Sequence, residues 1–226
     1  MKKIVFFTGL LCSLTMAAQT GYEINITFKP FKNQYIYLGH DFGKSYTIND
    51  YVNPVANSQA VFKGSKKLSG GIYLVGYPNK AGFFEILVDK QQHFSVIADT
   101  ATIAKGAKYV NSPDNDLFTE YQQQMSAFGK KINGLQAQLK AAATKADSAS
   151  ITETLTAEDK KVNAYRENLI KTHPDALLST LLICMREPEL KGELKNPVTK
   201  ADSTAAYNYF KSHFWDGVNF YDGRLA

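Results

Sequence analysis

The sequence predicts an α+β protein in which an N-terminal antiparallel β-sandwich or half-barrel precedes a helical domain with a long helical hairpin. From Gly21 to about Val110 apolar and polar residues alternate with a period of two, which is typical of strands with one buried face. From Ser112 onward apolar residues recur at steps of three and four, the spacing of one helix face. These patterns predict a β domain at 19–111 and a helical domain at 112–226.

The first strand is expected to begin at Tyr22, because Tyr22, Ile24, Ile26 and Phe28 alternate with polar residues. Further short runs bounded by Gly, Pro, Asn or Asp predict strands at Tyr35 to Leu38, Ala60 to Lys63, Ile72 to Tyr77, Phe83 to Val88 and Phe94 to Ala98. The five residues 89–93 are few enough to close a hairpin between the last two of these strands.

A long helix is expected to start after Ser112, an N-cap residue followed by Pro113 and by Asp114 at the positive end of the helix dipole. Its apolar stripe, from Leu117 to Leu139, predicts roughly 30 helical residues, about 45 Å. Residues 145–155 are polar and rich in Ser, Thr and Ala, which favours a connection. A second helix is then expected, capped at 156–159 and stopped by Pro174, so that the two helices form an antiparallel hairpin.

Two more helices are predicted toward the C-terminus. Asp175 caps a helix from Ala176 to about Arg186, which is apolar almost all round and is therefore expected to be buried. A polar spacer with two prolines and a glycine covers 187–199. It leads to a last short helix at about 201–214.

The first 18 residues have the order of a secretory signal peptide: Lys2 and Lys3, an apolar stretch at 4–16, then Ala17-Ala18. We therefore expect export to the periplasm. The apolar stretch is about half the ~20 residues that span a bilayer, and no later stretch is longer, so no transmembrane segment is expected after processing. Lipid attachment at Cys12 is the less favoured alternative, because bulky Leu11 stands where a small residue is expected.

Composition argues against several classes of function. Loss of Lys2 and Lys3 lowers the basic residues from 26 to 24 against 21 acidic ones, so the formal charge falls from +5 to +3. The basic residues are scattered, which gives a nucleic-acid partner no support. Processing also leaves Cys184 as the single cysteine, which excludes an internal disulfide and dithiol chemistry.

The chemically suggestive motifs each have a simpler interpretation. The stretch from Gly39 to Ser45 has three residues between its glycines where a phosphate-binding loop needs four, and it favours a turn between strands. Glu187 and Glu189 are expected to be solvated acids of the polar spacer rather than a glycosidase pair.

No metal, cofactor or catalytic set is expected either. The four histidines, His40, His93, His173 and His213, are far apart and lack the spacing of a helical zinc site. Cys184 lies among apolar neighbours that would raise its pKa, so it is expected to be an inert buried residue.

The one segment that suggests an interaction is the aromatic stretch at 213–222, which holds the only tryptophan. Aromatic anchors dominate interface energetics, so these residues are a candidate docking surface or hinge for a further domain: Trp215, Asp216, Phe220, Tyr221 and Asp222. The alternative is that they pack locally onto the helical hairpin.

These pieces together resemble the N-terminal half of extracytoplasmic thioredoxin-like thiol-disulfide oxidoreductases of the TlpA/ResA kind. The matching pieces are Gly21 to Ile24, Tyr37 to Gly39, Val61 to Gly64, Gly71 to Leu74, Asp89 to Val96, Ser112 to Asn115 with Leu117, Phe118 and Tyr121, His173 to Leu178, and His213 to Asp216 with Phe220 and Asp222. Each piece is weak alone, but together they cover nearly the whole mature chain.

The resemblance implies a β-rich domain, then a helical one, then a thioredoxin domain that carries a Trp-Cys-x-x-Cys site. That site is absent from this sequence, so no residue inherits a catalytic role, and the chain is either a fragment or a stand-alone paralogue. We expect an exported, non-catalytic accessory module whose partner is a protein or the thioredoxin domain. The alternatives are an independent periplasmic protein that binds a ligand or peptide, and an enzyme of unrecognised type.

Overall fold

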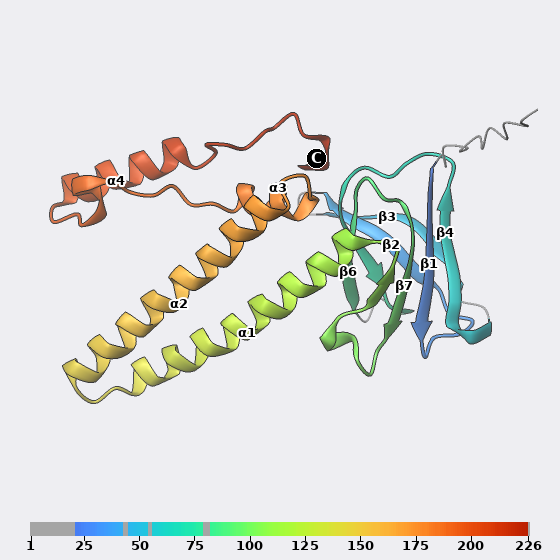
Figure 1. Cartoon of the computed structure of the whole chain (residues 1–226), viewed down its shortest axis with the longest axis horizontal. Helices are drawn as coiled ribbons and strands as arrows, with labels where there is room; N and C mark the ends of the chain where they lie inside the picture. The colour runs from blue at the N-terminus through green and yellow to red at the C-terminus, as the bar shows by residue number, and fades with distance from the viewer. Residues whose placement is uncertain (1–20, 43–44, 54–55, 79–81, 226) are drawn as a thin grey trace, which may run out of the picture.

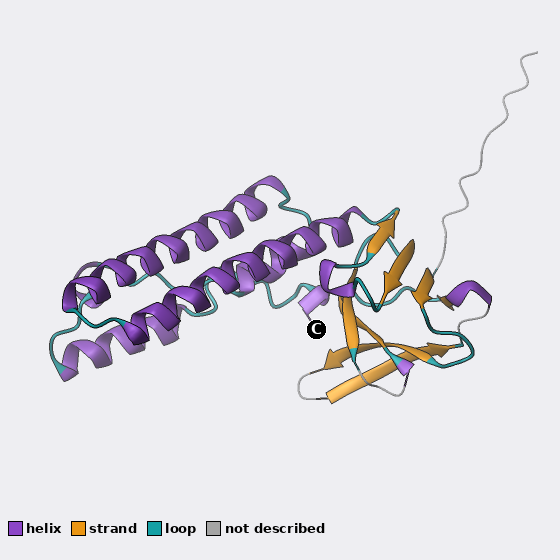
Figure 2. Cartoon of the chain, turned by 90° about the horizontal axis from the view of Figure 1, so that it is seen from below, coloured by secondary structure: helices purple, strands orange, loops and turns teal. Residues whose placement is uncertain are grey.

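The computed structural model describes residues 21–42, 45–53, 56–78 and 82–225, and shows a β-sandwich at one end of a long helical hairpin (Figure 1). Strands come first and helices follow, so the predicted α+β class is confirmed. Figure 2 shows the strands gathered at one end of the molecule, with the hairpin extending away from them. The expected signal peptide at 1–18 lies outside the described residues.

The sandwich has two four-stranded sheets. The first has the order β4 (Gln59–Gly64), β1 (Tyr22–Lys29), β7 (His93–Asp99) and β8 (Lys108–Val110). The second has the order β3 (Ser45–Val52), β2 (Ile36–Phe42), β5 (Gly71–Gly76) and β6 (Phe83–Val88). In the central pairings Ile24 of β1 stands opposite Phe62 in an antiparallel pair and opposite Phe94 in a parallel one. The parallel β1–β7 pair departs from the purely antiparallel sandwich that the sequence predicted.

The expected hairpin at residues 89–93 is wrong, because β6 and β7 belong to different sheets. The segment crosses between the sheets and is held there by Gln92, whose side chain is 4% exposed. The Gln92 amide donates to the Leu68 and Asp89 carbonyls at 2.8 and 3.1 Å, and its oxygen accepts from the Leu68 N–H at 2.8 Å. This network ties the crossover to the loop before β5, a contact that the strand pattern did not reveal.

The period-two pattern places one face of each strand in a shared core between the sheets. Ile24, Ile26 and Phe28 of β1 are fully or almost fully buried, and they face residues such as Leu38 and Val75 of the other sheet. Phe28 makes edge-to-face contacts with three other aromatic rings, those of Phe31, Tyr77 and Phe84. These geometries are favourable for aromatic pairs and anchor one end of the sandwich.

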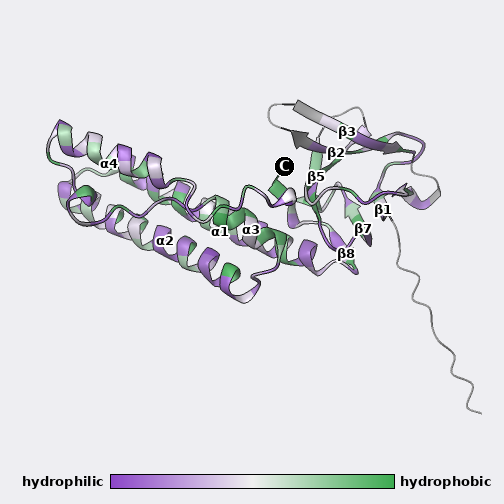
Figure 3. Cartoon of the chain, turned by 90° about the horizontal axis from the view of Figure 1, so that it is seen from above, coloured by the Kyte–Doolittle hydropathy of each residue, from purple (hydrophilic) through white to green (hydrophobic). Residues whose placement is uncertain are grey.

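Strand β6 connects the sandwich to the helices because its last three residues, Ile86 to Val88, are buried on both faces. Ile86 and Val88 point into the sandwich core, whereas Leu87 belongs to a second buried cluster. The other buried members of this second cluster are Phe118, Leu169, Leu177, Leu178 and Leu182 from the helices. Figure 3 shows the apolar ribbon concentrated around α3 (Leu177–Cys184), where the hairpin meets the sandwich.

The hairpin consists of α1 (Pro113–Ala141) and α2 (Lys145–Thr172), so the predicted connection at 145–155 is wrong. Thr144 is the N-cap of α2, and its hydroxyl accepts from the Asp147 N–H at 3.1 Å. Thr156, expected to cap the second helix, lies inside α2 and donates its hydroxyl to the Thr152 carbonyl. Ser and Thr side chains that bond back within a helix resemble caps in sequence, which explains the error.

The helix α3 is shorter than predicted and begins after Ala176, not after an Asp175 cap. Leu177, Leu178 and Leu182 are buried as expected, but Met185, beyond the end of the helix, is exposed. A single 3₁₀ turn at Gly192–Lys195 interrupts the spacer among the described residues. The last helix, α4 (Lys200–His213), lies close to its predicted position and has a capping box formed by Thr199 and Asp202. No helix in the described ranges is both long and apolar enough to cross a membrane.

Candidate functional site

The aromatic segment that follows α4 packs mainly on itself. The ring of Trp215 lies 4.8 Å from that of Phe214 and 5.6 Å from that of Phe220, both edge to face. Trp215 is 53% exposed, Phe220 68% and Tyr221 98%. None of these rings belongs to either buried cluster, and Asp216 is exposed as well. The segment therefore presents aromatic surface to solvent in place of covering the hairpin.

The far end of this segment is fastened to the body of the protein by Arg224. Its guanidinium donates to Asp222 at 2.6 to 3.0 Å, to the Thr180 hydroxyl at 2.8 Å and to Asp89 at 3.3 Å. The side chain also lies against Gly70, where an added Cβ would come within 2.6 Å of the Arg224 Cγ. The segment thus leaves α4, exposes its rings and returns to the junction between sandwich and α3 (Figure 1).

The charges at this junction influence one another. Hydrogen bonds from Arg224 lower the pKa of Asp222 to about 2, and Asp222 in turn raises the pKa of Arg224. Burial, and then the charge of Asp89, raises the pKa of Asp114 at the start of α1. Among these charged residues, the sequence predicted only Asp222 as a candidate interface residue. The roles of Arg224 and Asp89 were missed because these residues are 135 positions apart.

The other residues considered from the sequence are not brought together. Cys184 ends α3, is partly buried, and has its pKa raised by burial and by the charge of Asp222. Glu189 pairs with Lys195 at 3.0 Å, and Glu187 is exposed. Within the described residues there is no group of three His, Cys, Asp or Glu side chains that could hold a metal ion.

The glycine-rich stretch lies where a turn between strands was expected. Gly39 to Phe42 belong to β2 and Ser45 begins β3, while residues 43 and 44 lie outside the described part of the chain. No helix follows the stretch, so it has the wrong context for a phosphate-binding loop.

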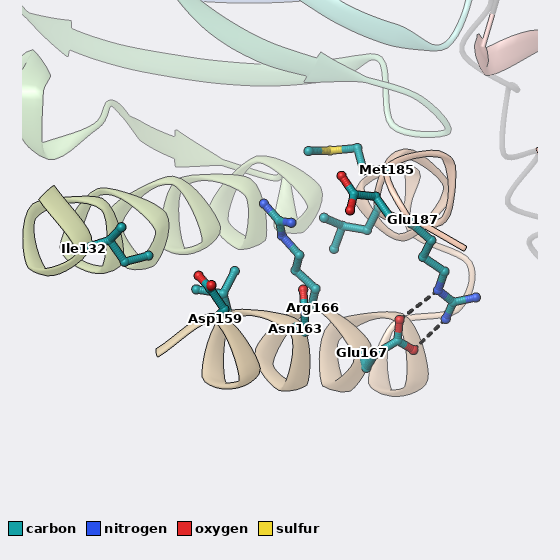
Figure 4. Close-up of a pocket in the computed structure, with 10 residues that line it drawn as sticks. Ile132, Asp159, Asn163, Arg166, Glu167, Met185 and Glu187 are labelled. Atoms are coloured by element: carbon teal, nitrogen blue, oxygen red, sulfur yellow. Dashed lines mark hydrogen bonds and ion pairs between the residues drawn. The ribbon is translucent and has the colours of Figure 1, made fainter. Parts of the chain in front are cut away.

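A hollow of about 500 Å³ lies between α1, α2 and the residues that follow α3 (Figure 4). Ile132 of α1 and Val162 of α2 form part of an apolar wall with Met185. The Arg166 side chain reaches into the hollow from α2, and Asp159 and Glu187 lie on either side of it. The hollow falls within the 300 to 1,000 Å³ range of small-molecule sites.

Arg166 is incompletely satisfied in this position. Its Nε is buried and has no hydrogen-bond partner within the described ranges, and its Nη2 contacts only the Met125 sulfur at 3.9 Å, a weak acceptor. An unpaired buried donor costs about 1–3 kcal/mol. Arg186 in the same hollow differs, because it makes two hydrogen bonds to Glu167, at 2.8 and 2.6 Å. No local sequence pattern distinguishes these two arginines.

Comparisons with family models, with curated proteins and with solved structures find no match to this chain.

Proposed function

We propose that this protein is an exported, non-catalytic interaction module for a thioredoxin-like thiol-disulfide oxidoreductase of the periplasm, with the aromatic segment at 214–222 as its docking surface. The observation that supports this most directly is the combination of three exposed rings, Trp215, Phe220 and Tyr221, with a fastened end at Arg224. The family of the partner rests on the resemblance of the sequence.

Exposed aromatic residues have the properties of interface anchors. Trp and Tyr bring large contact areas at a small cost in side-chain entropy, and they dominate the energetics of many protein interfaces. Because Arg224 ties the end of the segment to Asp89 and Thr180, less chain entropy is lost when a partner binds. A preorganised aromatic surface suits recognition of a folded domain.

The cysteine content supports a non-catalytic role. Thiol-disulfide exchange within one active site uses two thiols, and after loss of the first 18 residues Cys184 is the single cysteine in the sequence. Burial raises the pKa of Cys184, which lowers the thiolate fraction that could attack a disulfide.

The test is a calorimetric titration that measures the affinity of the purified mature chain for a thioredoxin-like domain of the TlpA/ResA kind from the same organism. We expect Trp215→Ala and Tyr221→Ala to weaken association about tenfold or more, as anchor residues do. Tyr207→Ala is the matched control, since Tyr207 is 63% exposed on α4 but lies outside the docking segment. The lack of any association, or reduction of insulin by this chain alone, would refute the proposal.

Peptide binding by the β domain is a second candidate. β8 is an edge strand of its sheet and pairs on one side only, with Ser95 to Ile97, so its outer edge could accept an added strand. A rise in melting temperature with an extended peptide, lost when a proline is placed in β8, would favour this function.

A further inference from the structure

We propose that the hollow between α1, α2 and the segment after α3 binds a small zwitterion with an apolar body, such as a short peptide. Arg166 would hold the carboxylate, one of the flanking acids, Asp159 or Glu187, would face the ammonium group, and Ile132, Val162 and Met185 would contact the side chains. The site is separate from the docking segment at 214–222, and it does not depend on the proposed partner.

The unpaired guanidinium is the first argument. Arg166 has no carboxylate partner in the part of the chain that the structure describes, and its buried Nε lacks any acceptor. A guanidinium presents parallel N–H groups that match the two oxygens of a carboxylate. Arg186 is less suited to this role, because its Nε and Nη2 groups already donate to the Glu167 carboxylate. Of the two arginines that line the hollow, Arg166 is therefore the one whose Nη groups lack a carboxylate partner among the described residues.

The neighbouring acids define the other end of the ligand. Asp159 and Glu187 both line the hollow, and neither forms an ion pair within the described residues. In Figure 4 they lie on either side of the Arg166 side chain. A simple anion would be repelled by these two acids, and a simple cation would be repelled by Arg166. A molecule that carries both charges can pair with Arg166 through its carboxylate and with one of the two acids through its ammonium group.

The apolar wall selects for an apolar ligand body. Ile132, Val162 and Met185 come from three different parts of the chain and line the same hollow. The rest of the lining is mostly polar or charged, so the hollow suits a ligand that has both an apolar part and charged groups. The methionine side chain adapts to ligands of different shape, so Met185 should accept several apolar ligand side chains and not one specific ligand.

The test uses leucyl-leucine as the probe and calorimetry on the mature chain at pH 7. We expect a dissociation constant of about 1 mM or below, with binding at least about tenfold weaker for leucyl-leucinamide and for N-acetyl-leucyl-leucine, since each lacks one charge. No heat of binding with leucyl-leucine up to about 10 mM would overturn the proposal. Equal binding of either blocked peptide would do the same.

Two variants test the role of Arg166 itself. Arg166→Gln should weaken leucyl-leucine binding about tenfold or more, whereas Lys160→Gln should leave it unchanged. Lys160 is an exposed residue of the same helix, so the two substitutions remove the same charge from α2. Because Arg166 has no strong partner to lose and its buried Nε is unpaired, the Arg166→Gln protein should melt at or above the temperature of the unmodified chain. Equal loss of affinity in both variants would mean that net charge, and not this site, governs binding.

Discussion

Asn115 of α1 hydrogen-bonds both backbone groups of Leu87 in β6. Its Oδ1 accepts from the Leu87 N–H at 2.7 Å, and its Nδ2 donates to the Leu87 carbonyl at 2.8 Å. Asn115 is fully buried, and β6 is one of the two edge strands of its sheet, so this amide takes the place of a missing strand. Since the Leu87 side chain enters the helical cluster, one residue pair joins the sandwich to the hairpin.

Asn115→Ala should therefore destabilise the protein substantially. Both backbone groups of Leu87 would lose their partner, and the unsatisfied N–H and carbonyl should lower the free energy of unfolding by about 2–4 kcal/mol in urea titrations. The matched control is Asn168→Ala at an exposed position of α2, which should change the stability by less than about 0.5 kcal/mol. A loss no larger than the control would show that the amide contributes little to this junction.

Glu158 joins the two helices of the hairpin through a pH-dependent contact. Its carboxylate is 3% exposed and accepts from Lys131 of α1 at 2.8 Å and from Lys161 at 2.7 Å, and these hydrogen bonds lower its pKa. Glu158→Gln should lower the melting temperature at pH 7, whereas Glu153→Gln, at an exposed position of α2, should not. Because the folded pKa is depressed, the contribution is present above about pH 4.3 and disappears as the pH falls through the lowered value. A gap in melting temperature that persists at pH 2 would contradict this.

The contact between Asp222 and Arg224 predicts an acid transition in the docking segment. The pKa of Asp222 is lowered to about 2 in the folded protein. At pH values above the ordinary Asp pKa of about 4 the carboxylate therefore stabilises the folded segment, and this stabilisation is lost as the pH falls from about 4 to about 2. Trp215 is the only tryptophan, and its fluorescence should change over this interval. Circular dichroism should show the helices still folded at the start of the change. In Asp222→Asn the change should be absent, and its persistence there would assign the transition to another group.

Cys184 should react slowly with thiol reagents. Burial and the charge of Asp222 raise its pKa, which lowers the thiolate fraction at pH 7. With a chromogenic disulfide reagent, the native chain should react severalfold more slowly than a Ser150→Cys variant made in a Cys184→Ser background, because Ser150 is exposed on α2. Equal rates in the native proteins would show that the thiol is freely accessible.

Local patterns predicted much of the secondary structure of this chain. The alternation in β1 identified which of its residues are buried, and Ser112-Pro113 marked the start of α1. Where side-chain chemistry was ambiguous the prediction failed: the Thr-rich start of α2 was taken for a connection, and β3, with a mostly polar sequence on a sheet edge, was not expected. These errors arise because Thr and Ser serve both as caps and as helix residues, and edge strands need no apolar alternation.

The candidate sites were less accessible to sequence reasoning than the fold. Aromatic content alone indicated the segment at 213–222, whereas the exposure of Trp215, Phe220 and Tyr221 is visible only in the structure, where none of them belongs to either buried cluster. By itself, the sequence determined the class of the fold, the faces of its strands and most helix positions, because periodicity records which side of an element is apolar. Only the tertiary structure decided that β6 and β7 lie in different sheets, that Arg224 reaches Asp89, and that Arg166 is left without a strong partner. These contacts join residues that are far apart in the sequence, so they depend on how the strands and helices pack against one another. The local spacing of apolar residues does not determine that packing.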